Sequence, residues 1–314
     1  MASAREQLLE NIHGVREAAK LSDLQRLAPL PANSPANRKA ELLRRGLYVV
    51  AFNSMEDYLK RRVTEHFTNL SSVSSLAFDE LPPGLQRAAV VDAIRNGVRE
   101  ASYDKGTEVD IIRAVAGAVA STDNRQQYKI HEFAVLRSGS NVSAEDIKAA
   151  IATLHIADAW GQMQKLVDSV GNVGTPIRAR FETCLLKRNS AAHAGQPIEY
   201  SDLIEIADLA VPLCFAFDAI FSAGMSRLAD NVPTGAKDPK IDLASQMEIR
   251  FVARRARGWC RLDQNKQPFR YYPNRQQAVQ HSLTRLSDGG TVVVLGSVGE
   301  ITGWHLRDHR HPHP

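Results

Sequence analysis

Apolar side chains recur at intervals of three and four residues over most of the first 230 positions, and this spacing is typical of amphipathic helices. The pattern is clear over residues 4–19 and returns in a long stretch over residues 38–69. Prolines at positions 29, 31 and 35 lie between the two stretches and forbid one continuous helix. The chain is therefore expected to be mainly α, with its helices packed as a bundle.

Proline, glycine and capping residues mark where the later helices begin and end. Ser143 is predicted to cap the helix that follows it, Gly195 to stop another, and Pro212 to kink or interrupt the last long helix. These helices are expected from Pro83 through Ile94 and over residues 106–128, 143–170, 177–192 and 201–221.

Beyond a linker over residues 231–247 the pattern changes to short β-rich runs separated by turns. Strands are predicted at 249–262, 269–272, 291–295 and 301–306, with a helix at 275–286. The expected organisation is a helical domain over residues 1–230 and a small basic α+β domain of ββαββ type over residues 248–314. Its end is expected to be a frayed tail rich in histidine, namely His305, His309, His311 and His313.

The formal net charge of +4 is unevenly distributed along the sequence. Residues 248–314 contain eleven Lys and Arg against five Asp and Glu, or +6, so the first 247 residues carry −2. The basic segment hints at a polyanionic partner, although solvated surface charge would look the same.

Composition disfavours several classes of protein. No apolar run approaches the roughly 18–20 residues that span a bilayer, and the N-terminus lacks a signal-peptide pattern. We therefore expect a cytoplasmic protein without membrane contacts. Cys184, Cys214 and Cys260 form no CxxC pair, which argues against a disulfide framework and a structural zinc site. No metal and no cofactor are expected.

The most informative segment is Arg188-Asn189-x-x-x-His193, at the end of the predicted 177–192 helix. Asn189 and His193 are four residues apart and share one helical face. Arg188 and His193 are five apart, which is about 140° around the axis of an α-helix, so one regular helix does not aim both at one point. Either the arginine stem wraps round, or the helix loosens near Gly195, or a second subunit completes the site.

These residue types suit cleavage of RNA without a metal ion, in which the 2′-hydroxyl attacks the adjacent phosphorus and the 5′-oxygen leaves. Histidine moves protons near neutral pH, and arginine is a permanently charged fork that matches phosphate oxygens. Lys187 is either an exposed contact to a backbone phosphate or merely solvated. Glu56 and Asp57 either orient Arg188 or His193 through a charge-assisted hydrogen bond or form a solvated face.

The same segment resembles the signature of the HEPN superfamily, which is an arginine, a polar residue, a short spacer and a histidine. In that superfamily the motif lies late in a helix and is followed by a loop and a final helix, as predicted here for residues 195–221. A second segment, residues 47–59, looks like the early helix of the RiboL-PSP and MAE-type HEPN families. The resemblance covers residues 38–224.

This resemblance implies a HEPN-like bundle that acts as an endoribonuclease and leaves 2′,3′-cyclic phosphate and 5′-hydroxyl ends. His193 would be the general acid/base, Arg188 the transition-state stabiliser and Asn189 the residue that orients the substrate. HEPN ribonucleases usually pair two motifs across a dimer, and many are toxins or antiviral defence effectors. The resemblance therefore implies a homodimer and an antitoxin or regulatory partner. A non-catalytic HEPN module that binds RNA, a nucleotide or a protein stays open as the alternative.

The C-terminal segment interleaves basic and aromatic residues, a pattern that suits stacking on unpaired bases together with phosphate contacts. A small sheet with an aromatic core and solvated arginines is the alternative. The residues in question are Arg254, Arg255, Arg257, Trp259, Arg261 and Tyr271.

Overall fold

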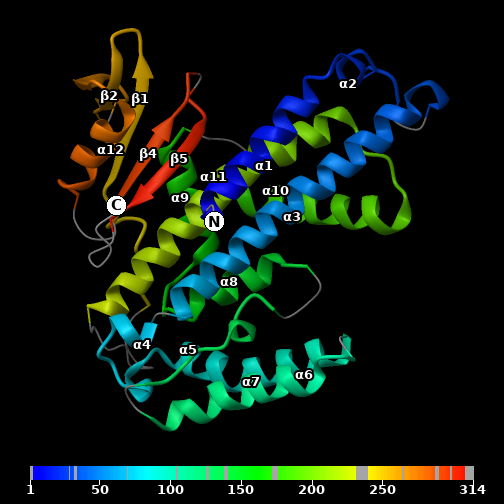
Figure 1. Ribbon diagram of the computed structural model, residues 1–314. Helices are drawn as coiled ribbons and strands as arrows, with labels where there is room; N and C mark the ends of the chain where they lie inside the picture. The colour runs from blue at the N-terminus through cyan, green and yellow to red at the C-terminus, as the bar shows by residue number, and fades with distance from the viewer. Residues whose placement is uncertain are drawn as a thin grey trace.

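The computed structural model describes residues 3–27, 29–31, 34–68, 70–103, 105–124, 127–137, 141–171, 176–230, 240–263, 265–286, 290–297 and 299–307. Within these ranges the protein is mainly helical, and a mixed five-stranded sheet lies near the C-terminal end of the chain (Figure 1). The expected fold class, mainly α followed by a small α+β part, is confirmed at this level.

The helices are α1 (Ala4–Ala19), α2 (Ser22–Leu27), α3 (Arg38–Thr68), α4 (Leu70–Val73), α5 (Pro83–Arg87), α6 (Ala93–Tyr103), α7 (Glu108–Ala120), α8 (Ala144–Ala152), α9 (Ala159–Ser169), α10 (Ile177–Asn189), α11 (Tyr200–Ala229) and α12 (Arg275–Leu283). The strands are β1 (Ile249–Arg255), β2 (Gly258–Leu262), β3 (Pro268–Tyr272), β4 (Thr291–Leu295) and β5 (Ile301–Leu306).

Helices α1 and α3 form where the apolar spacing predicts them. A capping box closes the start of α1, because the Ser3 hydroxyl accepts a hydrogen bond from the Glu6 N–H at 3.2 Å and the Glu6 carboxylate accepts one from the Ser3 N–H at 2.8 Å. The apolar face of α1 is buried, and the helix packs against α3 and α11.

Helix α11 is the centre of the bundle, since α1, α3, α9 and α10 all pack against it. The predicted interruption at Pro212 does not occur, because the helix continues through this residue to Ala229. Proline removes one backbone donor from a helix. Nearly every residue around Pro212 is buried in the core, however, and tertiary packing of this kind outweighs the local loss.

The predicted helix over residues 143–170 is wrong, because the structure has two helices there. Ser143 is the N-cap of α8 as expected, accepting from the Asp146 N–H at 3.2 Å. The chain breaks at His155 and Asp158, which both have positive φ, and the Asp158 side chain caps α9. Helix α7 is also shorter than the predicted 106–128, since it ends at Ala120.

The strand order in the sheet is β3-β2-β1-β4-β5, with β1 and β4 parallel and the other neighbours antiparallel. The predicted strand over residues 249–262 is a hairpin of two strands, in which Gly258 has φ +120°, a backbone conformation that favours glycine. The topology is therefore βββαββ and not ββαββ. His305, expected in a frayed tail, lies in β5, while His309, His311 and His313 lie outside the described residues.

One face of the sheet packs on the helical body and the other lies under α12 (Figure 1). Phe251, Cys260 and Trp304 belong to the same hydrophobic core as α1, α3 and α11. Val252 and Val294 pack on the opposite face, beneath α12. The two predicted domains thus share one hydrophobic core within the described ranges.

Gln162 of α9 anchors the described part of the predicted linker. Its Nε2 donates to the carbonyl oxygens of Ala157 and of Ile241, the latter at 3.0 Å. Its Oε1 accepts from the backbone N–H groups of Leu243 at 2.7 Å and Ala244 at 3.1 Å. One buried amide therefore satisfies four backbone groups, and residues 240–247 are held against the bundle.

Gln162→Ala is expected to lower the free energy of unfolding by about 1–3 kcal/mol, because the buried N–H of Leu243 loses its acceptor. Urea denaturation measures this change, and hydrogen exchange should show faster opening of the Leu243 and Ala244 amides. Gln280→Ala, at an exposed position of α12, is the control and should change stability little. Equal effects of the two substitutions would contradict the anchoring role.

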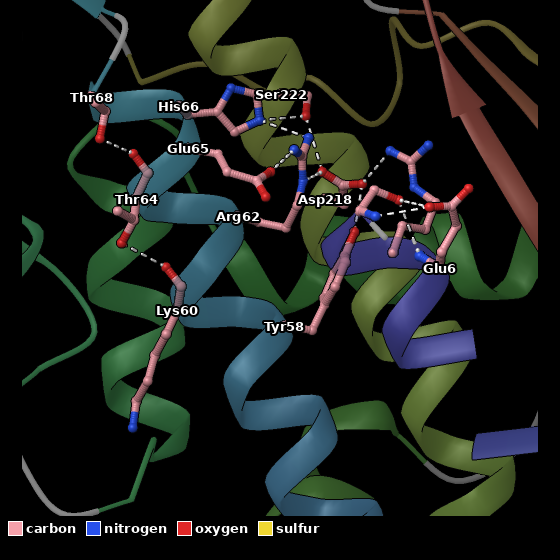
Figure 2. A network of polar contacts seen from close by, with 12 residues as sticks. Glu6, Tyr58, Lys60, Arg62, Thr64, Glu65, His66, Thr68, Asp218 and Ser222 are labelled. Carbon is pink, nitrogen blue, oxygen red and sulfur yellow. Dashed lines mark hydrogen bonds and ion pairs between the residues drawn. The ribbon is translucent and has the colours of Figure 1, made fainter. Parts of the chain in front are cut away.

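Asp218 of α11 is fully buried and joins three other elements (Figure 2). It accepts hydrogen bonds from the Tyr58 hydroxyl and from the Trp304 indole N–H, both at 2.7 Å. It also forms ion pairs with Arg62 at 2.9 Å and with Arg5 at 3.0 Å. These donors come from α1, α3 and β5, so one carboxylate ties the first helix and the last described strand to the centre of the bundle.

The partners of Asp218 fix its charge state. Burial alone would raise the pKa of Asp218, but the positive charges of Arg62 and Arg5 and the hydrogen bond from Tyr58 lower it well below its ordinary value of 3.8. Burial, together with the charge on Asp218, raises the pKa of Tyr58 well above 10, so that its hydroxyl remains a donor. Ser222 also donates to Asp218, at 3.1 Å, and lies within 3.0 Å of His66 Nε2 (Figure 2).

Candidate active site at the end of helix α10

Helix α10 ends with Arg188 and Asn189, and a π-helical turn over Ser190–Ala194 follows it. The N–H of Gly195 bonds to the carbonyl five residues earlier, and Gly195 itself has φ +64°. The predicted stop at Gly195 is confirmed. The helix does loosen near Gly195, which is one of the three expected ways to bring Arg188 and His193 together.

The wider turn changes the direction of His193 relative to Arg188. Residues five apart are about 140° apart around an α-helix of 3.6 residues per turn. A π-helical turn closes on the fifth residue, which brings such a pair closer to alignment along the axis, and short π segments occur frequently at functional sites. The His193 side chain is exposed, and within the described residues it forms no hydrogen bond.

The Arg188 guanidinium is held by neutral amides. Its Nη2 donates to Asn53 Oδ1 on α3 at 3.3 Å, and its Nη1 donates to Asn189 Oδ1 at 3.4 Å. Asn141 Nδ2 donates to the same Asn189 oxygen at 3.0 Å. No carboxylate pairs with Arg188 in the described part of the chain, and its buried Nε has no hydrogen-bond partner there. A full positive charge and spare N–H donors are therefore available to an anion.

Asn53 and Asn141 are site residues that the sequence motif does not reveal. Asn141 comes from the turn before α8, far from the motif in sequence. Asn53 lies within the 47–59 segment, three residues before Glu56. This spacing puts the two residues on one helical face, and it was the only feature of the sequence that could have pointed to Asn53.

Glu56 does not orient Arg188 or His193 directly, which corrects that expectation. Its buried carboxylate accepts from the N–H of Val142 and pairs with Lys60 at 3.3 Å. Val142 follows Asn141, which bonds to Asn189. Glu56 therefore supports the motif indirectly. It holds Val142 in place, and the preceding residue, Asn141, donates to Asn189.

Asp57 and Lys187 have partners away from the guanidinium. Asp57 is exposed and pairs with Arg61 at 3.5 Å, as expected of a solvated face. Lys187 is neither fully exposed nor free, because its ammonium pairs with Asp202 of α11. Its side chain is still 41% exposed, so the expected contact with a backbone phosphate stays a prediction.

Helix α3 holds the motif at several points along its length. The Tyr48 hydroxyl donates to the carbonyl of Cys184 at 3.1 Å, and Arg45 Nη2 donates to the carbonyl of Gly195 at 2.9 Å. Together with Asn53, these contacts bind α3 to the body of α10, to the end of the π-helical turn and to the guanidinium. The turn is thus positioned by rigid helices, as a catalytic group requires.

A groove of about 440 Å³ runs along α3 and is lined by Asn53, Lys60, Arg61 and Arg137, among others. The cations in it are compensated, since Lys60 and Arg61 pair with carboxylates one turn away on α3 and Arg137 pairs with Glu132 at 2.7 Å. Arg188 does not line the groove, but its guanidinium donates to Asn53, which does, and no carboxylate of the described residues pairs with it.

A larger cavity, of about 1620 Å³, lies between α1, α11, α12 and β5. Arg5 and Arg62 line it, but both are already paired with Asp218. Its floor is therefore a structural network, and it offers an anion less than Arg188 does.

The six residues predicted to bind RNA do not form one surface. Side chains alternate between the two faces of a strand. Arg254, Trp259 and Arg261 lie on the α12 side, in line with Val252, and Trp259 packs against the core there, as the aromatic-core alternative expects. The remaining three lie elsewhere: Arg255 and Tyr271 on the body side, in line with Cys260, and Arg257 in the β1–β2 turn.

No protein-family model, no curated protein and no solved structure matches this chain. Its class accordingly follows from the structure alone: a helical bundle that shares its core with a small α+β sheet. Among the described residues, no three His, Cys, Asp or Glu side chains gather as a set of metal ligands. In the same ranges, no helix combines the length and the apolar character that crossing a bilayer requires.

Proposed function

We propose that this protein is a metal-independent endoribonuclease of HEPN type. The observation that carries the proposal is the Arg188 guanidinium, which is held by neutral amides and lies five residues before the exposed His193. An uncompensated arginine and an exposed histidine are the minimum that phosphodiester transesterification needs, namely a charge for the phosphorane and a group that moves protons.

In the proposed reaction, His193 takes the proton of the ribose 2′-hydroxyl as that oxygen attacks the adjacent phosphorus. Arg188 stabilises the negative charge on the phosphorane oxygens, while Asn189 helps to position the substrate. The bond from phosphorus to the 5′-oxygen then breaks, and this oxygen takes a proton from a second acid. In a homodimer that acid is His193 of the second copy. The products carry a 2′,3′-cyclic phosphate and a 5′-hydroxyl.

A metal-free ribonuclease of this kind suits a toxin or an antiviral defence effector, since it needs only RNA in order to act. Such an enzyme harms its host unless it is restrained, so the proposal includes an antitoxin or regulatory protein as a partner. The proposed location is the cytoplasm, where cellular RNA and invading RNA are found.

One observation favours the alternative, a non-catalytic HEPN module that binds RNA, a nucleotide or a protein partner. Catalytic histidines are commonly oriented by a hydrogen bond to a third group, and the His193 ring has none within the described residues. A binding module needs the charge of Arg188 but no oriented imidazole.

The test uses end-labelled RNA and the purified protein in excess EDTA, beside Arg188→Ala protein prepared in the same way. We expect cleavage by the wild type only, with 2′,3′-cyclic phosphate ends. RNA with a single 2′-deoxy substitution at the cleaved position should resist, because the nucleophile is missing. Cleavage of that substrate at the same bond, or cleavage only when a divalent cation is added, would refute the mechanism.

Asn53→Asp should slow cleavage about fivefold. The new carboxylate would pair with Arg188, and an exposed ion pair of this kind would reduce the stabilisation of the transition state by about 1 kcal/mol. Asn53→Ala removes the amide without adding charge and serves as the control, with a smaller expected effect. The measurement is kcat/KM on a short labelled RNA. A faster Asn53→Asp enzyme would show that the charge of Arg188 does not act on the phosphate.

A further inference from the structure

Strand β3 is an edge strand of the sheet, and it exposes large aromatic side chains. Phe269 is 64% exposed and Tyr271 is 41% exposed. Exposed rings on an edge strand are unfavourable in isolation, because they leave apolar area in water next to unpaired backbone groups. Their presence indicates a surface that contacts something else.

Arginines lie over the rings of this strand. The guanidinium carbon of Arg261 is 4.6 Å from the centre of the Phe269 ring, and that of Arg270 is 5.6 Å from the Tyr272 ring. Arg270 Nη1 also lies 3.3 Å from His281 Nε2 on α12. Cations and rings therefore lie together across β2, β3 and α12, and the exposed Arg285 follows two residues after α12. We call Arg261, Phe269, Arg270, His281 and Arg285 the β3 surface.

Within the described residues, no carboxylate compensates the arginines of the β3 surface. None of Arg261, Arg270 and Arg285 forms an ion pair with the described residues. Partial burial lowers the pKa of His281, and the charges of Arg285, Arg270 and Arg261 lower it further. His281 therefore holds its proton less readily than a free histidine does, because three arginines lie near it.

We propose that the β3 surface binds an unpaired segment of RNA. Guanidinium groups fit the phosphates, and the exposed Phe269 ring stacks on a base. Bases inside a duplex are already stacked on one another, so a ring of this kind favours unpaired nucleotides. The inference rests on the proposed function for the choice of RNA. Of the six residues predicted from the sequence the β3 surface keeps only Arg261, and Trp259 is held by the core. The surface adds Phe269, Arg270, His281 and Arg285.

Binding is measured by fluorescence anisotropy with labelled oligouridine and the full-length His193→Ala protein, so that cleavage does not interfere. Phe269→Ala should raise Kd by roughly 5- to 100-fold, the effect of losing one base–aromatic stack. Arg270→Ala and Arg285→Ala should each also lower the slope of log Kd against log salt concentration by about 0.7, the value for one phosphate contact on a single strand. Arg95→Ala, at an exposed position of α6, is the control and should change neither quantity.

The separate effects on affinity and on salt dependence make the assignment specific. Unchanged binding by Phe269→Ala, tighter binding of duplex RNA, or competition by polyglutamate as strong as that by RNA would overturn it. Equal affinity for the matching deoxyoligonucleotide would overturn the assignment to RNA. Because binding is measured in a protein without His193, failure of the nuclease proposal leaves these outcomes unchanged, and failure of the β3 surface leaves the cleavage assay unchanged.

Discussion

His193→Ala is expected to slow RNA cleavage by about 10²- to 10⁴-fold, the usual contribution of one positioned general acid or base. The fold should be unaffected, because the side chain is exposed and forms no hydrogen bond within the described residues. Initial rates on labelled RNA in EDTA measure the loss, and circular dichroism with thermal unfolding confirms that the fold is intact.

Two neighbouring substitutions sharpen this result. Arg188→Lys keeps the charge but loses the planar fork, so it should retain only part of the activity. Lys187→Ala is the matched control, since the charge of Lys187 is already neutralised by Asp202, and it should cleave at close to the wild-type rate. An unchanged rate in His193→Ala would leave the binding module as the better proposal.

Asp218→Ala is expected to lower the free energy of unfolding by about 3–5 kcal/mol, because it removes the buried carboxylate that pairs with two partly buried arginines. Arg5 and Arg62 are its ion-pair partners, and Tyr58 and Trp304 would lose an acceptor as well. Urea denaturation at neutral pH measures the change.

The same helix supplies a matched control for Asp218. Asp208 is 58% exposed and pairs with Arg16 at 3.3 Å, so Asp208→Ala should cost no more than about 1 kcal/mol. Comparable losses for the two variants would show that burial of Asp218 has no special energetic weight.

The stabilisation by Asp218 should also disappear in acid. The folded state lowers the pKa of this carboxyl below its ordinary value of 3.8, so the unfolded chain binds the proton more readily. The contribution is therefore fully present above about pH 3.8 and is lost progressively below it. The difference in unfolding free energy between wild type and Asp218→Asn should shrink over that acid range. A difference independent of pH would contradict the ion pairing.

The helices of the bundle were predictable where the apolar spacing and the caps agree. Ser143 and Gly195 mark helix ends in the sequence and in the structure. The errors have two different causes. Asp158 caps α9 through a local hydrogen bond from Gly161, a signal that the apolar period around it masks. Pro212 is tolerated because the core surrounds it, which local propensity does not show.

The candidate site was predictable in its motif but not in its surroundings. Arg188 and His193 follow from residue type and spacing, whereas Asn53 and Asn141 reach the guanidinium only because the fold brings α3 and the turn before α8 together. For Asp218 the sequence holds one signal, namely a single carboxylate in a nearly continuous apolar run. Such a group is rarely buried without a partner, so this position indicates a buried polar contact. The partners of Asp218, which come from α1, α3 and β5, could not be read from the sequence.

The hydrogen bond from Arg5 to the carbonyl of Trp304, at 2.8 Å, joins residues 299 positions apart. Closing so long a loop is slow compared with forming local helices, so docking of the sheet onto the bundle is expected to come late in folding. Until then the apolar flank of α11 is exposed to neighbouring molecules. Aggregation should therefore occur mainly during refolding and increase with protein concentration, whereas the folded protein should aggregate little.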